Sequence, residues 1–169
     1  VTDDGTFSIR FRPASTWGLS FKVPAEVGAD ALLLTMQSGV ADGTYRYLSQ
    51  KIPNARWGEG KVVALAFWFW RGSWQDTAIE SITIVQNFGV GGSADVETEL
   101  ANYTVIKPLQ WNRYEYAAIL PSTAGKTFGE GHHIELRTHF VASEDLWVND
   151  SCIGGIQLNT GHRALPFVS

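Results

Sequence analysis

The chain has 169 residues, of which 44% are hydrophobic and 18% charged, with a formal net charge of -4. This composition is typical of one globular domain with a buried core, and it excludes a disordered chain. The mild negative charge and the lack of a lysine or arginine cluster argue against a nucleic-acid partner. No apolar run approaches the ~18 residues needed to span a bilayer, so we expect no membrane partner. A single cysteine, Cys152, excludes an intramolecular disulfide.

Short β-branched and aromatic runs, separated by Gly, Pro, Asn and Asp, predict about nine or ten strands and no long helix. In chain order the strands are expected near residues 6–12, 17–22, 31–37, 45–51, 61–70, 80–87, 102–107, 111–119, 133–141 and 153–158. So many short strands favour an all-β fold, an antiparallel two-sheet β-sandwich of the jelly-roll type. We expect one such domain over residues 1–169, as one module of a longer protein.

The strand expected near 61–70 contains the run "VVALAFWFW". Val63, Leu65, Phe67 and Phe69 would share one face, and small residues followed by Trp68 and Trp70 the other. Because both faces are apolar, this strand is predicted to be central in its sheet. The alanines and tryptophans of the second face would also suit a shallow hollow with an aromatic wall.

The tryptophans continue into "FWFWRGSWQD", which is the strongest candidate for a ligand site. The C–H faces of sugar rings stack on indole, and their hydroxyl groups need charged or amide partners. Trp68, Trp70 and Trp74 would supply the stacking surfaces. The alternative is that these side chains pack between the sheets or against a neighbouring subunit.

A glycine-rich run, "QNFGVGGSADVET", follows the strand expected near 80–87. A phosphate-binding loop would need a Lys-Ser/Thr pair after the glycines, or a helix that begins there, and neither is evident. We therefore predict a turn in which one or more glycines adopt positive φ.

In "GHHIELRTHFV" apolar and polar residues alternate. The polar face of this strand would present His133, Glu135, Arg137 and His139. His133 and His139 are six positions apart and lie ~20 Å from each other on a strand, which is too far to bind one zinc ion. Glu135 and Arg137 are therefore expected to form an ion pair or to contact a ligand.

The six candidate ligand-binding residues are Trp68, Trp70, Trp74, Glu135, Arg137 and His139. If they form one site, their side chains must share one face or one cleft. No cofactor is expected. A structural Ca²⁺ is compatible with oxygen-rich loops such as "VNDS", but the sequence does not fix its ligands.

Several ordered segments resemble a module of bacteriophage tail fibres, tailspikes and head fibres. The matching motifs are "QNFGVGGS", "WNRY", "PSTAGKTFG", "IELRTHF" and "QLNTGHRALPF", and the resemblance runs from about Tyr45 to the C-terminus. The chain departs from the family's pattern at Asn159, where an acidic residue is common, and at Leu165, where threonine is common. Both departures concern how the closing segment packs.

The resemblance implies a jelly roll similar to carbohydrate-binding modules, carried on a homotrimeric protein of the virion and therefore extracellular when it acts. It also implies attachment to bacterial surface polysaccharide. The resemblance supplies no catalytic residues to carry over, and the sequence has no G-x-S-x-G motif, so we expect no enzyme activity. One alternative is a structural module for trimerisation or virion decoration. A polysaccharide depolymerase is a further alternative, and it would require two carboxylates facing each other in a cleft.

Overall fold

The structure, a computed structural model, describes residues 7–13, 30–36, 46–71, 77–106, 110–140 and 151–165. These ranges contain nine strands: β1 (Phe7–Pro13), β2 (Asp30–Met36), β3 (Arg46–Pro53), β4 (Val62–Arg71), β5 (Thr77–Asn87), β6 (Val96–Ile106), β7 (Asn112–Ile119), β8 (His133–Phe140) and β9 (Ser151–Thr160). Within the same ranges, no helix has the length and apolar character to cross a membrane.

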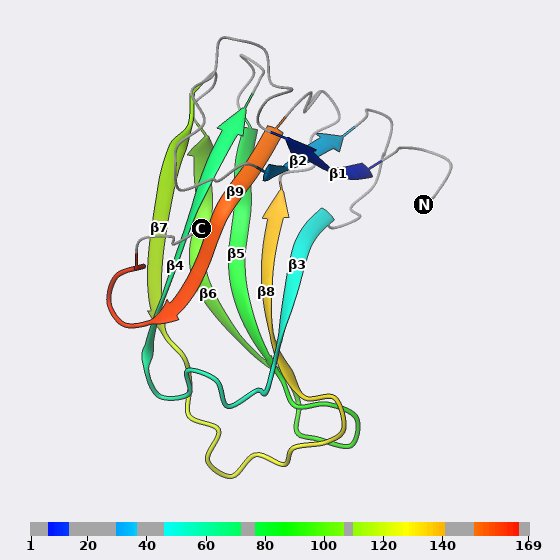
Figure 1. Ribbon diagram of the computed structural model, residues 1–169. Coiled ribbons are helices and arrows are strands. Elements are labelled where there is room, and N and C mark those ends of the chain that lie inside the picture. The colour runs from blue at the N-terminus through cyan, green and yellow to red at the C-terminus, as the bar shows by residue number, and fades with distance from the viewer. Residues whose placement is uncertain are drawn as a thin grey trace.

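The strands form two sheets (Figure 1). The five-stranded sheet has the order β1-β2-β9-β4-β7, and the four-stranded sheet has the order β3-β8-β5-β6. Neighbouring strands in both sheets are antiparallel. The predicted all-β fold, an antiparallel two-sheet sandwich, is therefore confirmed.

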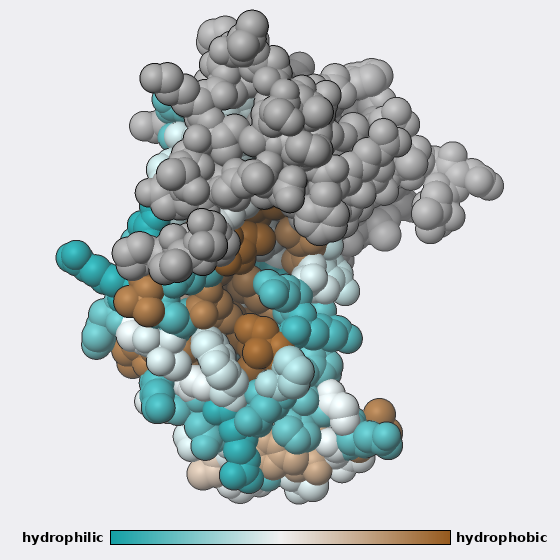
Figure 2. All heavy atoms as spheres, in the orientation of Figure 1, coloured by the Kyte–Doolittle hydropathy of each residue, from teal (hydrophilic) through white to brown (hydrophobic). Residues whose placement is uncertain are grey.

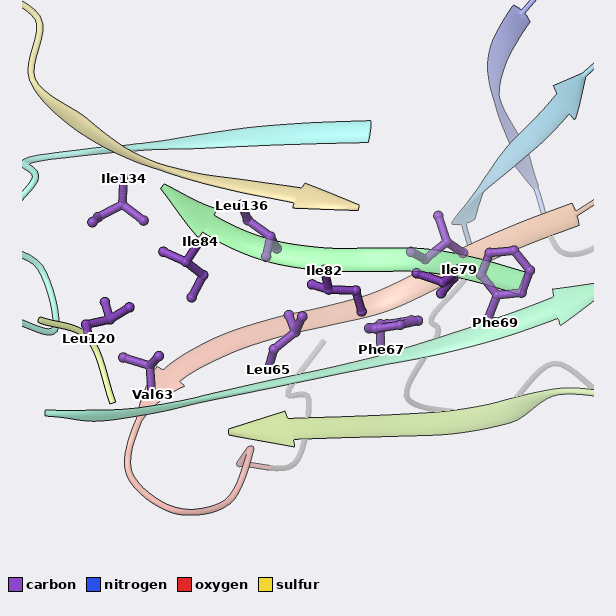
Figure 3. Close-up of a cluster of buried hydrophobic side chains, with 11 residues drawn as sticks. Val63, Leu65, Phe67, Phe69, Ile79, Ile82, Ile84, Leu120, Ile134 and Leu136 are labelled. Carbon is purple, nitrogen blue, oxygen red and sulfur yellow. The ribbon is translucent and has the colours of Figure 1, made fainter. Parts of the chain in front are cut away.

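The core lies between the sheets, and β4 contributes much of it. As its pattern predicts, β4 is an interior strand, paired with β9 on one side and β7 on the other. Phe67 is 1% exposed and stacks on Tyr114 with ring centroids 5.6 Å apart. Figure 3 shows the apolar side chains of β4 directed toward those of β5 and β8. The buried cluster consists of Val63, Leu65, Phe67, Phe69, Ile79, Ile82, Ile84, Leu120, Ile134, Leu136 and Ile153.

Most predicted strands coincide with observed ones within a few residues. The strand expected near 17–22 lies outside the described residues. The predicted start of the strand near 102–107 is wrong, because β6 already begins at Val96. Its first half alternates exposed Glu97 and Glu99 with half-buried Val96 and Thr98, as expected for a strand with one side toward the core.

The connections at the lower end of Figure 1 form a closely packed base, which we define as residues 54–61, 88–95 and 121–132. The glycine-rich run lies here and is a turn, as predicted, with positive φ at Gly89 and Gly91. Gly129 N–H donates to the Phe88 carbonyl at 2.7 Å, and Val90 pairs with Glu130 in an isolated antiparallel bridge. The glycine-rich run therefore joins the connection at 88–95 to the connection at 121–132 through backbone hydrogen bonds.

One long side of the sandwich is closed by a contact between its two sheets. The hydroxyl groups of Thr104 on β6 and Tyr116 on β7 are 2.7 Å apart. Burial raises the pKa of the Tyr116 hydroxyl, and the hydrogen bond with Thr104 opposes that rise only in part. A protonated tyrosine therefore links the two sheets throughout the neutral range.

Candidate functional site

The outward side of the four-stranded sheet carries three rows of mainly polar side chains, which we call the polar face. Residues that pair across antiparallel strands point to the same side of the sheet, so the registers define the rows. The first row is Tyr47, His139, Ser81 and Asn102, the second is Ser49, Arg137, Thr83 and Glu99, and the third is Lys51, Glu135, Val85 and Glu97.

The middle of the polar face is organised by an ion pair between neighbours on β8. Arg137 Nη2 donates to Glu135 Oε2 at 2.8 Å, and Arg137 Nη1 lies 3.3 Å from Glu97 Oε1 on β6. The predicted pairing of Glu135 with Arg137 is confirmed. It is not a fully solvated pair, because the Glu135 side chain is only 7% exposed.

The environment of Glu135 favours its ionised form. Burial alone raises the pKa of this carboxyl group, but hydrogen bonds from Arg137 and Ser49, together with the charges of Arg137 and Lys51, outweigh burial. The pKa of Glu135 therefore lies below its usual range. The hydrogen bond to Glu135 in turn raises the pKa of Arg137. Both groups remain charged at neutral pH.

An exposed aromatic ring lies beside this ion pair. Tyr47 on β3 is 43% exposed, and its ring centroid lies 5.2 Å from that of His139, with the planes tilted by 39°. The guanidinium carbon of Arg137 lies 5.6 Å from the centre of the Tyr47 ring. A cation at this distance from an aromatic ring attracts its electron-rich face. The two contacts hold a flat, partly exposed ring at one end of the polar face.

The floor of the polar face is formed by β5, whose side chains there are short. Ser81 and Thr83 are half-buried, as are their neighbours His139 and Arg137 on β8, whereas their neighbours Asn102 and Glu99 on β6 are exposed. Val85 is fully buried between Glu135 and Glu97. The result is a strip of short side chains along β5, which the Arg137–Glu97 contact crosses.

Tyr47 and the two glutamates of β6 were not among the predicted site residues. The signal that could have found Tyr47 is the alternation in "YLSQKIP", where Tyr47, Ser49 and Lys51 take the positions opposite to Leu48 and Ile52. Glu97 and Glu99 were missed because β6 was expected to begin after them.

The predicted tryptophans lie on the other sheet. Trp68 and Trp70 belong to β4 and point to the outward side of the five-stranded sheet, away from the core. Trp68 is half-buried and Trp70 is only 5% exposed. Trp74 lies outside the described residues. Trp68 is therefore the accessible member of the described pair.

The requirement that all candidate residues share one face is not met. Glu135, Arg137 and His139 point outward from the four-stranded sheet, whereas Trp68 and Trp70 point outward from the five-stranded sheet. The two outward sides of a sandwich are separated by both sheets and by the core between them. Sheets packed face to face lie about 10 Å apart. A single site built from both groups is wrong, and the polar face and the tryptophan face are separate candidates.

The expected shallow hollow beside the tryptophans is also absent in the described part of the chain, because its floor is covered. Ala64 is 0% exposed and Ala66 is 3% exposed. Their cross-strand neighbours Asn159 and Glu115 hold the residues that follow β9: Asn159 Oδ1 accepts from Leu165 N–H at 3.0 Å, and Glu115 Oε1 accepts from Ala164 N–H at 2.9 Å. The closing segment thus lies against the face that would have formed the hollow.

A cleft opens on the long side of the sandwich between β3 and β9. It encloses about 290 Å³, part of which is open solvent, and Figure 2 shows hydrophobic residues in a hollow on this side. Its walls are Leu48, Gln50, Leu65, Phe67, Leu136, Thr138, Ile153 and Ile156. Only Gln50 and Thr138 contribute polar side chains, so the cleft offers few partners for the hydroxyl groups of a sugar.

No metal site emerges from the described residues, since no three His, Cys, Asp or Glu side chains there gather closely enough to hold an ion. The Nδ1 atom of His133 lies 2.8 Å from the Gly131 carbonyl oxygen in its own turn. The loop containing "VND", considered for Ca²⁺, lies outside the described residues.

The topology and layers define an antiparallel β-sandwich with the jelly-roll architecture of carbohydrate-binding modules. Solved structures with this fold include a tandem family 22 carbohydrate-binding domain of Xyn10C from Paenibacillus barcinonensis, with a TM-score of 0.56 and 13% identity over 89% of this chain and 46% of that one. The C-terminal family 22 module of Xyn10B from Clostridium thermocellum has a TM-score of 0.53 and 12% identity over 98% of this chain and 90% of that one.

Tailspike protein 4 of bacteriophage CBA120 has the same fold in part of its enzymatically active domain, with a TM-score of 0.53 and 14% identity over 92% of this chain. The present chain spans only 18% of that tailspike chain and 46% of the tandem domain. No family model matches the sequence, and no curated protein matches it. At these identities the likeness establishes the fold.

Proposed function

We propose that the protein is a carbohydrate-binding module of a bacteriophage fibre, tailspike or head-fibre protein, and that it attaches the virion to bacterial surface polysaccharide. Two similarities to solved structures support this proposal. The fold is that of family 22 carbohydrate-binding modules, and a phage tailspike contains the same fold. The ordered motifs that resemble phage fibre modules support the same source. The module would then act outside the cell, as part of a homotrimeric virion protein.

The observation that carries the proposal is the exposed Tyr47 ring at the end of the polar face. A sugar ring can stack its C–H face on such a side chain. His139 and Arg137 hold the ring in place, which reduces the entropy lost when a ligand binds. Asn102 and Glu99, on the far side of β5, offer hydrogen-bonding groups to hydroxyl substituents. Each site would be weak alone and stronger when three copies bind one polymer.

We propose binding without catalysis. Glycoside hydrolysis requires one carboxyl group with a raised pKa as general acid. Glu135 is the most buried carboxyl group on the polar face, yet its pKa is lowered, since the hydrogen bonds from Arg137 and Ser49 more than offset the effect of burial. It is therefore unsuited to donate a proton. A depolymerase activity of this face is the least favoured alternative.

The test is a glycan-array screen followed by affinity electrophoresis of wild type, Tyr47→Ala and Tyr47→Phe. An aromatic contact contributes about 0.5–1.5 kcal/mol, so Tyr47→Ala should weaken binding by up to about tenfold. Tyr47→Phe keeps the ring and is the matched control, expected to remain within about twofold. Binding that survives Tyr47→Ala but is lost in Trp68→Ala would move the site to the tryptophan face.

The alternative of a structural module is favoured by one feature, the apolar Ile119 on the edge strand β7, which is 67% exposed. If this residue packs against another subunit, the isolated module should associate at high concentration, and Ile119→Lys should abolish that association. Sedimentation of both proteins, combined with a lack of binding to any polysaccharide, would support the structural role and contradict the proposed one.

A further inference from the structure

The charged groups of the polar face are unequal in number and unevenly placed. Its three rows contain two cations, Lys51 and Arg137, and three carboxylates, Glu135, Glu97 and Glu99. All five belong to described residues, so the described part of this face has an excess of negative charge at neutral pH. The excess lies on β6, at the opposite edge of the sheet from Lys51 on β3.

Of the two cations, Arg137 is not available for an acidic ligand without loss of a contact within the protein, whereas Lys51 is exposed on the edge strand β3, two rows from Tyr47. Arg137 uses one terminal nitrogen for Glu135 at 2.8 Å and the other near Glu97 at 3.3 Å. The charge of Lys51 acts on Glu135, whose pKa it helps to lower after the larger effects of burial and the hydrogen bonds from Arg137 and Ser49. A bidentate contact between Arg137 and a sugar carboxylate would therefore have to displace a carboxylate of the protein.

The carboxylates of β6, in contrast, face solvent. The Glu97 side chain is 61% exposed, and Glu99 is exposed and accepts a hydrogen bond from Asn102 Nδ2 at 3.3 Å. An ionised carboxylate only accepts hydrogen bonds. Sugar hydroxyl groups donate to such acceptors, whereas a uronic acid or phosphate group adds more acceptors and a like charge.

We propose that the polar face selects an uncharged polysaccharide, a hexose or pentose polymer without carboxylate or phosphate groups. This inference rests on the proposed function and adds its ligand class. The sugar ring stacks on Tyr47, the chain lies over Ser81 and Thr83, and its hydroxyl groups donate to Glu97 and Glu99. An acidic polymer in the same position meets these two exposed carboxylates, while the exposed cation Lys51 lies on the other side of the face, on β3.

The test compares polymers that differ only in charge. Affinity electrophoresis uses methyl-esterified galacturonan with galacturonan and mannan with mannuronan, next to the glycan-array hits, at about 20 and 300 mM salt. The neutral member of a pair should bind more tightly, and its affinity should change little with salt. Any residual binding of the acidic member should strengthen at high salt, because salt screens repulsion between like charges.

The variants Glu97→Gln and Glu99→Gln remove the repulsion one charge at a time. Each should improve the affinity for an acidic polymer by up to about fivefold, the size of an exposed charge effect. Glu130→Gln is the matched control, since Glu130 is an exposed glutamate of the base outside the three rows.

The outcomes separate this inference from the function on which it rests. An acidic polymer that binds more tightly than its neutral counterpart, and more weakly as salt rises, would overturn the inference and leave carbohydrate binding intact. Equal improvement by Glu130→Gln would also overturn it, because the effect would then reflect net charge alone. A protein that binds no glycan on the array would overturn the proposed function and with it this inference.

Discussion

Gly129→Ala should destabilise the protein far more than Gly91→Ala, although both glycines lie in the base. A Cβ atom at Gly129 would lie 2.0 Å from the Val90 carbonyl oxygen and 2.7 Å from the Gly92 backbone nitrogen. These are backbone atoms, so the two connections must separate to make room. A Cβ atom at Gly91 would meet nothing within 4 Å, and only its φ of +77° disfavours alanine.

The expected magnitudes follow from this geometry. Overpacking costs about 1–3 kcal/mol. Separation of the connections also weakens the hydrogen bonds from Gly129 to Phe88 and from Glu130 to Val90, each worth about 1 kcal/mol. We therefore expect a loss of about 2–4 kcal/mol for Gly129→Ala. The left-handed conformation alone gives about 1–2 kcal/mol for Gly91→Ala.

Urea denaturation of the three proteins measures the difference, with unchanged m-values required for a two-state comparison. In thermal unfolding each 1 kcal/mol corresponds to a shift of about 2–4 °C for a domain of this size. If Gly91→Ala cost as much as Gly129→Ala, positive φ rather than close approach would explain the glycines, and this reasoning would be wrong.

Three further predictions concern the core, the hydrogen bond between the two sheets and the ion pair. Phe67→Ala removes a buried ring that stacks on Tyr114 and should lower the free energy of unfolding by about 3–5 kcal/mol in the same urea assay. Tyr116→Phe deletes the hydrogen bond with Thr104 and should cost about 0.5–1.5 kcal/mol, whereas no loss would contradict a link between the sheets. The pKa of Glu135 is lower in the folded than in the unfolded chain, since the hydrogen bonds from Arg137 and Ser49 and the nearby positive charges together outweigh burial. The ionised Glu135 therefore stabilises the fold fully above the usual pKa of 4.5, and this stabilisation is lost as pH falls through the folded pKa. Urea midpoints between pH 3 and 7 should therefore fall less steeply in acid for Glu135→Gln than for wild type, and parallel profiles would contradict the assignment.

Residue patterning was sufficient for most of the fold because alternation reports which side of a strand is buried. It placed β4 at the centre of a sheet, since only an interior strand has apolar residues on both sides. It failed at the start of β6, where no strand was expected before residue 102 although the strand begins at Val96. Charged residues are compatible with a strand when they all point to solvent, as Glu97 and Glu99 do.

The candidate site was harder to predict, because a pattern shows the two sides of a strand but not which strands share a sheet. Arg137 lies on the polar side of β8, and Trp68 lies on the side of β4 opposite to Phe67, as alternation predicts. Whether two outward sides coincide depends on the order of strands in the sheets, and that order is fixed by contacts distant in sequence. The same limit explains why the closing segment over Ala64 could not be foreseen.

Two of the motifs that resemble phage fibre modules lie apart from the residues proposed to bind sugar. "QNFGVGGS" and "PSTAGKTFG" meet in the base, where Gly92 and Gly129 leave no room for a side chain. The polar face uses outward positions of strands, whose side chains can change without disturbing the core. It follows that substitutions in the base should change stability, and that substitutions at Tyr47, Glu97 or Glu99 should change ligand affinity at nearly constant stability. If the polar face binds glycans as proposed, its specificity can change while the fold stays the same.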